Sequence, residues 1–320
     1  MVDRTDKKRI IQDAIVSKNT KRKILNKLFT GATVACIALA MIPLGSILIE
    51  VVKNGYVAIS YEFLTEPQGK MVASSSDLRN CEGLGIPPQS CEIGGVGPAI
   101  QGTLIVVGYA SLIGVPIGVL TGVYLSEYAG NNRFAKAIRF FNNVMTGLPS
   151  IVVGIVGYVA LVITLGPFNV TAGAVALSII MIPIIVGVTE ETLKLVPGSI
   201  REAGHSLGIP KWKVTMLITL RSAKNGVLTG IVLGISRIAG ETAPLIMTIL
   251  GTSLFFSTFA GPVDALPLRI WRLASQPYAN AHSSGWGAAL ILILMILSMS
   301  IILRALVLDR RGKITAGARI

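Results

Sequence analysis

The sequence has very little charge for its length. Of its 320 residues, 14% are Asp, Glu, Lys or Arg, whereas 52% are hydrophobic, and the mean hydropathy is +0.69. Soluble globular domains carry about 25% charged residues. The shortage of charge therefore argues against a soluble protein of this size and favours a membrane protein.

Residues that perform chemistry are also scarce. The chain has no G-x-x-x-x-G-K-[ST] loop with which to hold nucleotide phosphates. The hydrophobic runs contain no nucleophile with a neighbouring base, no paired carboxylates and no metal-binding cluster. His205 and His282 each stand alone. We therefore expect a protein that is not an enzyme, binds no cofactor or metal, and has no ATP-binding site of its own.

Long uncharged runs take the place of charge. A membrane-spanning helix needs about 20 predominantly apolar residues, and the sequence offers six such crossings. They lie within residues 28–49, 93–126, 140–189 (two crossings), 226–250 and about 286–303. The Gly-Pro-Phe-Asn cluster at 166–169 divides the pair. The first run exceeds the core of a secretion signal, and no small-residue cleavage site follows it, so we expect a retained helix.

The basic residues show which loops share a side of the membrane. Of the 29 Lys and Arg, 23 lie in the two terminal segments and in the loops after the second and fourth crossings, and five lie in the other loops. Lys and Arg concentrate in cytoplasmic loops. The protein is therefore predicted to span the cell membrane with both termini in the cytoplasm. The net charge of +13 is then a matter of topology, with contact to anionic lipids near the N-terminus as a lesser expectation. No nucleic-acid motif accompanies it.

This topology divides the chain into three parts. Residues 1–27 form a basic cytoplasmic segment, residues 28–308 form the six-helix domain, and residues 309–320 form a cytoplasmic tail. The six-helix domain includes an external loop, 52–97, and a long cytoplasmic loop, 190–225.

The sequence has three cysteines. Cys81 and Cys91 lie in the external loop, where they either form a disulfide or remain free thiols. Cys36 lies in the first crossing and is interpreted as a small packing residue.

The fifth crossing contains two full charges, Arg237 and Glu241. At about 100° per residue, they share one narrow helical stripe with small residues. The stripe comprises Gly226, Gly230, Gly234, Arg237, Glu241 and Pro244. Glycines four apart allow another helix to approach closely, so the stripe is predicted to face protein or a water-filled path. A second glycine ridge, Gly114, Gly118 and Gly122, is predicted to serve helix packing alone.

Two roles remain open for these charges. In the first, Arg237 and Glu241 form an ion pair that holds helices together. In the second, Glu241 restrains a guanidinium that accompanies an anion across the membrane. The planar donors of Arg match two oxygens of a phosphate-like oxyanion. A charge at mid-bilayer costs about 2.5–3.5 kcal/mol on insertion scales, which favours a functional reason for its presence.

The long cytoplasmic loop contains the sequence PGSIREAGHSLGIPKWKV at 197–214. Ser199 with Glu202 three residues later predicts a capping box and a short helix beginning at Ile200. Gly208 is expected to end this helix after two turns, and Pro210 to start a new helix that continues into the fifth crossing. A two-turn helix is unstable alone, so it must pack on its own bundle or on a partner.

This loop resembles the EAA loop of the permease subunits of ABC importers. EAGHSLG is followed by Ile218 and Leu220, with Gly204 in place of the usual Ala and Arg221 in place of the usual Pro. The resemblance implies that residues 202–214 form the coupling helix that docks on an ATP-binding subunit. The coupling residues it implies are Glu202, Ala203, Gly204 and Gly208.

Further stretches narrow the resemblance to the PstA-type permeases of phosphate importers. They are YEFLTEPQG, GVGPAIQGTL, GLPSIVVG, VTEETLKLVP, RIAGETAPL and RLASQP, in order between residues 61 and 277. The resemblance implies an all-α polytopic membrane protein with the type I ABC importer permease (MetI-like) bundle. It also implies a heterodimer with a PstC-type subunit, two ATP-binding subunits and an external phosphate-binding protein. Arg237 and Glu241 fall on charged positions that this family associates with phosphate passage.

The function predicted is that of an ATP-driven phosphate permease subunit, in which closure of the ATP-binding subunits moves the helix at 200–207. The alternatives are a permease for another oxyanion such as sulfate, and the paired PstC-type subunit. An ungated anion channel and a structural or signalling membrane anchor are more remote alternatives. The channel would not need a docking helix, and the anchor would tolerate neutral substitution of both charges.

Overall fold

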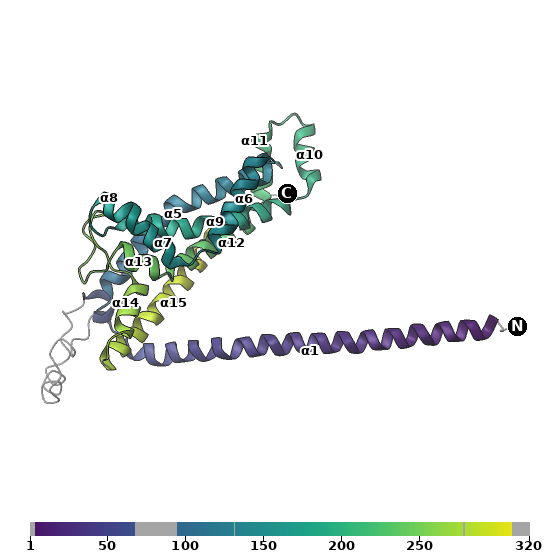
Figure 1. Ribbon diagram of the computed structural model, residues 1–320, viewed down its shortest axis with the longest axis horizontal. Coiled ribbons are helices and arrows are strands. Elements are labelled where there is room, and N and C mark those ends of the chain that lie inside the picture. Colours follow the sequence, from purple (N-terminus) through teal and green to yellow (C-terminus); the bar gives the residue numbers. More distant parts are fainter. Residues whose placement is uncertain (1–3, 68–94, 131, 278, 309–320) are drawn as a thin grey trace, which may run out of the picture. The chain divides into compact units, whose positions relative to one another are not determined.

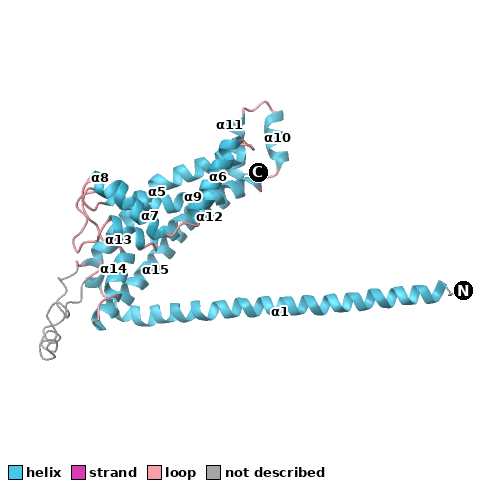
Figure 2. Ribbon diagram, viewed as in Figure 1, coloured by secondary structure: helices cyan, strands magenta, loops and turns pink. Residues whose placement is uncertain are grey.

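The computed structural model describes residues 4–67, 95–130, 132–277 and 279–308, and these are almost entirely helical (Figures 1 and 2). The α-helices of the first half are α1 (Arg4–Ala58), α2 (Tyr61–Thr65), α5 (Gly97–Val123), α6 (Arg133–Thr146), α7 (Ser150–Gly157) and α8 (Ile163–Leu165). Those of the second half are α9 (Val170–Lys194), α10 (Gly198–Ser206), α11 (Lys211–Lys213), α12 (Leu220–Ala239), α13 (Ala243–Thr248), α14 (Leu266–Ala274) and α15 (Ala279–Leu308). The π-helical turns are η1 (Tyr124–Tyr128), η2 (Tyr158–Val162) and η3 (Val214–Thr219). Cys81, Cys91 and the predicted tail 309–320 lie outside the described residues.

The chain divides into two compact units, residues 1–53 and 54–320. The first unit consists of most of α1, in which Leu25–Ala58 is long and apolar enough to cross a membrane. The predicted first crossing, 28–49, falls within this segment. The second unit holds the other helices and contains the sites described below.

Four helical segments meet the length and hydropathy of a membrane span. They are Leu25–Ala58, Gly97–Tyr128, Val170–Lys194 and Ala281–Ala305. A fifth span arises if the bent pair Arg133–Thr146 and Ser150–Val162 is counted as one. The predicted fifth crossing, 226–250, corresponds to α12, which does not meet this test because it contains the charged residues Arg221, Lys224 and Arg237 and is more polar than these spans. An all-α polytopic membrane protein is confirmed, and the count of six stays a prediction.

The third crossing differs from the straight helix that its apolar run suggested. It begins earlier, at Arg133, and turns by 105° between α6 and α7. Gly147 ends α6, and Pro149 precedes α7 in an extended conformation (ψ 132°). Proline lacks an N–H and disfavours helical geometry in the residue before it, which explains the break. The predicted division at 166–169 is confirmed, because α8 ends at Leu165 and Asn169 caps α9.

Helix α9 forms the centre of the second unit, with α5 and α12 beside it (Figure 1). Both predicted glycine ridges pack on α9. A Cβ added to Gly118 of α5 would lie 2.8 Å from Ile185 Cβ, and one added to Gly230 of α12 would lie 2.8 Å from Val188 Cβ. The helices approach closely because no side chain separates their backbones at these positions.

Filling this contact is expected to destabilise the bundle. Gly118→Val places a branched side chain against Ile185, and overpacking of this kind costs about 1–3 kcal/mol. Thermal unfolding in detergent should show a midpoint lower by several degrees. Gly108→Val is the matched control, because Gly108 lies on the same helix with open space around its Cβ position. Equal midpoints for the two variants would contradict the packing role of the ridge.

A buried ion pair fixes the segment between α13 and α14. Arg269 of α14 donates from Nε to Asp264 Oδ2 at 2.6 Å, and the side chains are 2% and 0% exposed. Arg269 also donates to the Thr252 carbonyl at 3.3 Å. The start of α5 joins this cluster, because Thr103 Oγ1 accepts from the Leu266 N–H at 2.8 Å. Two segments more than 150 residues apart in sequence are thereby held together.

Candidate functional site

Arg237 lies in the last turn of α12, which ends at Ala239 with Gly240 as its C-cap. Its guanidinium pairs with Glu241 at 3.5 Å (Nη2 to Oε1), one turn later, as the sequence predicts. The Arg237 side chain is 51% exposed and that of Glu241 is 15% exposed. At 3.5 Å this ion pair is longer than those of Arg139 and Arg201, both 2.8 Å, and it leaves half of the Arg237 side chain uncovered by this chain.

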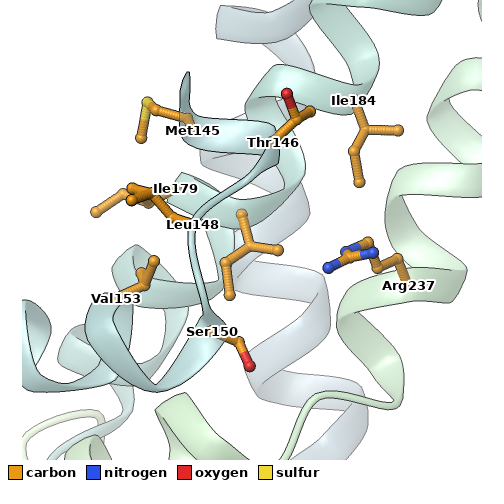
Figure 3. A pocket seen from close by; sticks show the side chains of 9 residues that line it. Met145, Thr146, Leu148, Ser150, Val153, Ile179, Ile184 and Arg237 are labelled. Atoms are coloured by element: carbon orange, nitrogen blue, oxygen red, sulfur yellow. The ribbon is translucent and has the colours of Figure 1, made fainter. Parts of the chain in front are cut away.

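Arg237 also lines a small cavity of about 50 Å³. Its side chain extends from α12 toward the turn between α6 and α7, where Thr146 and Ser150 lie (Figure 3). The remaining lining residues are Met145, Leu148, Val153, Ile179, Ile180 and Ile184. A water molecule needs at least about 10–15 Å³ of such space. The break in the third crossing thus places hydroxyl groups and space for a few waters beside the charge.

The predicted stripe is correct up to Arg237 and wrong beyond it. The helix stops before Glu241, and Pro244 becomes the second residue of a new helix, α13, in place of an interior position of α12. Proline is favoured in a first helical turn, where its missing N–H needs no partner. Pro244 packs instead on Gly154 of α7, whose added Cβ would lie 2.9 Å from Pro244 Cα. The motifs GLPSIVVG and RIAGETAPL therefore pack against each other, through Gly154 and Pro244.

The short helix of the long loop is α10, and its start differs from the prediction. It begins at Gly198 with Pro197 as the N-cap, and no side chain caps it. The predicted capping box is wrong, because Ser199 lies inside the helix. The Pro197 ring fixes its own backbone next to the first turn, so the helix starts without the Ser199 cap.

The end of α10 confirms the expected role of Gly208. Gly208 has φ +70°, and its N–H donates to the His205 carbonyl at 2.9 Å. The Ile209 N–H donates to the Gly204 carbonyl at 3.4 Å. These two bonds form a Schellman motif, in which glycine readily adopts the left-handed conformation. Pro210 is the N-cap of α11, whereas the sequence predicted it as the first residue of that helix. The chain then continues through η3 into α12.

The predicted coupling residues separate into two faces of α10. Glu202 and Ala203 are exposed, as are the neighbouring His205 and Leu207. Gly204 is buried on the opposite face, where its added Cβ would lie 3.0 Å from Val214 Cγ2 of η3. Gly204 therefore serves close packing of α10 on the bundle, beyond the slight loosening of the helix that glycine implies.

Several ion pairs near α10 were not identified as site residues from the sequence. Arg201 of α10 pairs with Glu127 of η1 at 2.8 Å. Arg139 of α6 and Lys194 both pair with Glu190 of α9, at 2.8 and 2.6 Å. Glu127, Arg139 and Glu190 directly border the uncharged runs 93–126 and 140–189, and this position is their signal in the sequence. In the described ranges, no group of His, Cys, Asp and Glu is arranged to hold a metal ion.

The chain has clear similarity to known transport proteins. Residues 114–312 match the family described as "Binding-protein-dependent transport system inner membrane component". The chain is 39% identical over 220 residues to the phosphate transport system permease protein PstA of Yersinia pestis, covering 69% of this chain and 75% of that protein. It is 35% identical over 283 residues to PstA of Haemophilus influenzae, covering 88% and 94%. The probable PstA of Methanocaldococcus jannaschii is 34% identical over 290 residues, covering 90% and 96%.

Solved structures share the fold at low sequence identity. A chain of a bacterial alginate ABC transporter superposes with a TM-score of 0.57 at 15% identity, covering 89% of this chain and 94% of that one. A chain of the MetNI methionine ABC transporter gives a TM-score of 0.51 at 18% identity, covering 66% and 93%. The ABC permease fold and the multi-pass inner-membrane character predicted from the sequence are thus confirmed. The chain belongs to the PstA family of phosphate transport system permease proteins, within the binding-protein-dependent ABC transporters.

Proposed function

We propose that this chain forms one wall of the phosphate path of an ATP-driven importer, with Arg237 beside the passing anion and α10 as the docking element for the ATP-binding subunit. The observation that carries the proposal is the half-exposed side chain of Arg237 beside a small cavity that Thr146 and Ser150 also line. A charge in the membrane normally faces protein or a water-filled cavity.

Glu241 restrains the arginine in this account. At 3.5 Å the carboxylate lowers the positive potential of Arg237 without covering the guanidinium. Phosphate accepts paired hydrogen bonds from a planar guanidinium. The N–H donors that Glu241 leaves uncovered can therefore hydrogen-bond briefly to a passing anion. Weak binding allows the phosphate to dissociate toward the cytoplasm, and an import path requires this release.

The same exposure supports a second permease subunit. Half of the Arg237 side chain is uncovered by this chain, and such a group is costly against lipid. A PstC-type partner across the path would complete its surroundings, and the transporter class to which the chain belongs implies ATP-binding subunits and a binding protein.

The orientation of the chain follows from its charges. Lys and Arg concentrate in cytoplasmic loops. The 23 Lys and Arg in the two terminal segments and in the loops after the second and fourth predicted crossings therefore favour a cytoplasmic position for both termini and for α10. The exposed face of α10, with Glu202, Ala203 and Leu207, is then available to an ATP-binding subunit. In this assignment, the loop between α13 and α14 faces the binding protein.

Reconstitution tests this function. The chain is co-expressed with its PstC-type, ATP-binding and phosphate-binding partners, purified, and placed in liposomes. We expect ATP hydrolysis that rises when the phosphate-loaded binding protein is added, together with phosphate uptake. Stimulation by a sulfate-binding protein with sulfate would favour the other oxyanion. Uptake by the chain alone without ATP would overturn the proposal in favour of a channel.

A further inference from the structure

Arg201 gives α10 a polar connection to two other helices. The guanidinium donates to the Glu127 carboxylate from Nη2 at 2.8 Å and from Nε at 3.2 Å (to Oε2). The Arg201 side chain is 24% exposed and that of Glu127 is 6% exposed. A largely covered, charge-assisted, two-point contact of this kind has a fixed geometry, unlike a surface ion pair.

The same guanidinium also binds the C-terminal end of α9. Nη2 donates to the Leu193 carbonyl at 2.7 Å, and Nη1 donates to the Val196 carbonyl at 2.8 Å. The last carbonyls of a helix lack helical partners, and a cation near them is favoured by the helix dipole. Leu193 and Val196 are themselves buried in a cluster with Val123 of α5 and Val227 of α12. Arg201 is therefore fixed to the part of the core where α5, α9 and α12 meet.

Two of the elements that α10 contacts on this side are π-helical turns. Glu127 belongs to η1, whose wide turn closes with the Ala129 N–H donating to the Tyr124 carbonyl at 2.9 Å. Gly204 packs on Val214 of η3, at the start of the segment that leads to α12 and Arg237. In addition, Lys211 lies 5.0 Å from the centroid of the Tyr128 ring in η1. Such turns frequently occur at functional sites.

We infer that Arg201 is the positioning residue through which a movement of α10 reaches the ends of α5 and α9. This inference rests on the proposed function, in which an ATP-binding subunit moves α10. Arg201 faces the bundle, opposite to the exposed docking face, so its task is transmission and not docking. When α10 is displaced, the hydrogen bonds of Arg201 move η1 and the carbonyls of Leu193 and Val196 with it. The bundle then changes the side to which the path around Arg237 opens.

The test measures coupling separately from docking. Arg201→Gln, Glu127→Gln and the double variant are purified as the full complex and reconstituted in liposomes. Co-purification of the ATP-binding subunit, ATP hydrolysis and phosphate uptake are then measured. We expect normal co-purification and continued ATP hydrolysis, with uptake per ATP lowered about tenfold, within the range of allosteric coupling factors. The double variant should equal Arg201→Gln, because that single variant already loses the contact with Glu127.

The matched control is Arg221→Gln, which removes the same charge from an exposed position on α12 and should leave uptake per ATP unchanged. Unchanged uptake per ATP in Arg201→Gln would overturn the inference. Loss of the ATP-binding subunit from that variant would also overturn it, since Arg201 would then serve docking. If the unmodified complex shows no phosphate-dependent hydrolysis, the proposed function itself is wrong, and this outcome is distinct from any difference between variants.

Discussion

Arg237→Ala is expected to lower phosphate uptake strongly while the transporter still assembles. The variant removes the guanidinium that lines the cavity beside Thr146 and Ser150. Hydrogen bonds to charged groups contribute about 1.5–3 kcal/mol, so uptake should fall roughly 10- to 150-fold. Membrane insertion should not suffer, because an alanine is easier to place in the bilayer than an arginine. Uptake of radioactive phosphate and co-purification of the partner subunits measure the two effects.

The control for this prediction is Arg221→Ala, an exposed arginine at the start of the same helix. Its uptake should remain close to that of the unmodified protein. If Arg237→Ala also retained uptake, the pair with Glu241 would be a structural ion pair, the alternative that the sequence leaves open. If Arg237→Ala lost the partner subunits, the same structural role would be indicated.

Arg269→Met is expected to destabilise the protein more strongly than Gly118→Val. It leaves the Asp264 carboxylate buried without its partner, because the Asp264 side chain is 0% exposed. Breaking a buried pair by removing one partner costs about 3–5 kcal/mol. The midpoint of thermal unfolding in detergent should fall accordingly. The double variant Asp264→Leu with Arg269→Met should recover most of the loss, since apolar groups of similar volume replace such pairs well.

The pH dependence of Arg269→Met adds a second readout. Burial raises the pKa of the Asp264 carboxyl, and Arg269 lowers it in part. Without Arg269, the folded-state pKa rises further above the unfolded value. As pH falls toward the folded-state pKa, the buried carboxyl takes up a proton and the unfolded one does not, so folding is favoured. The defect should therefore shrink at acid pH, and a loss independent of pH would contradict this account.

The sequence predicted the membrane helices well where charge was absent. The runs at 93–126 and 140–189 became α5, the bent α6–α7 segment and α9, because long apolar stretches have few stable alternatives in a bilayer. The glycine ridges predicted which faces pack, since small residues at helical spacing allow close approach. The end of α10 was also predictable, because Gly208 adopts a conformation that few other residues tolerate.

Other features depended on contacts that local patterns do not show. Ser199 and Glu202 have the spacing of a capping box, yet the helix begins at Gly198 beside Pro197. Helix α12 ends before Glu241, although the hydropathy of 226–250 suggested one continuous crossing. Arg201 and Glu127 pair with each other from different elements, and Arg269 pairs with Asp264, which precedes its helix. Charges that border or interrupt apolar runs were visible in the sequence, but their pairing required the three-dimensional arrangement.

The most direct test of the central claim is the accessibility of position 237 in the assembled transporter. Arg237→Cys is introduced after Cys36, Cys81 and Cys91 are replaced by serine, and the reconstituted complex is treated with a membrane-impermeant, negatively charged thiol reagent. We predict that the cysteine reacts from the aqueous phase in at least one nucleotide state, and that phosphate slows the reaction. A thiol that stays unreactive with and without ATP, while a cysteine at the exposed position 221 reacts, would contradict the claim that Arg237 lines an aqueous phosphate path.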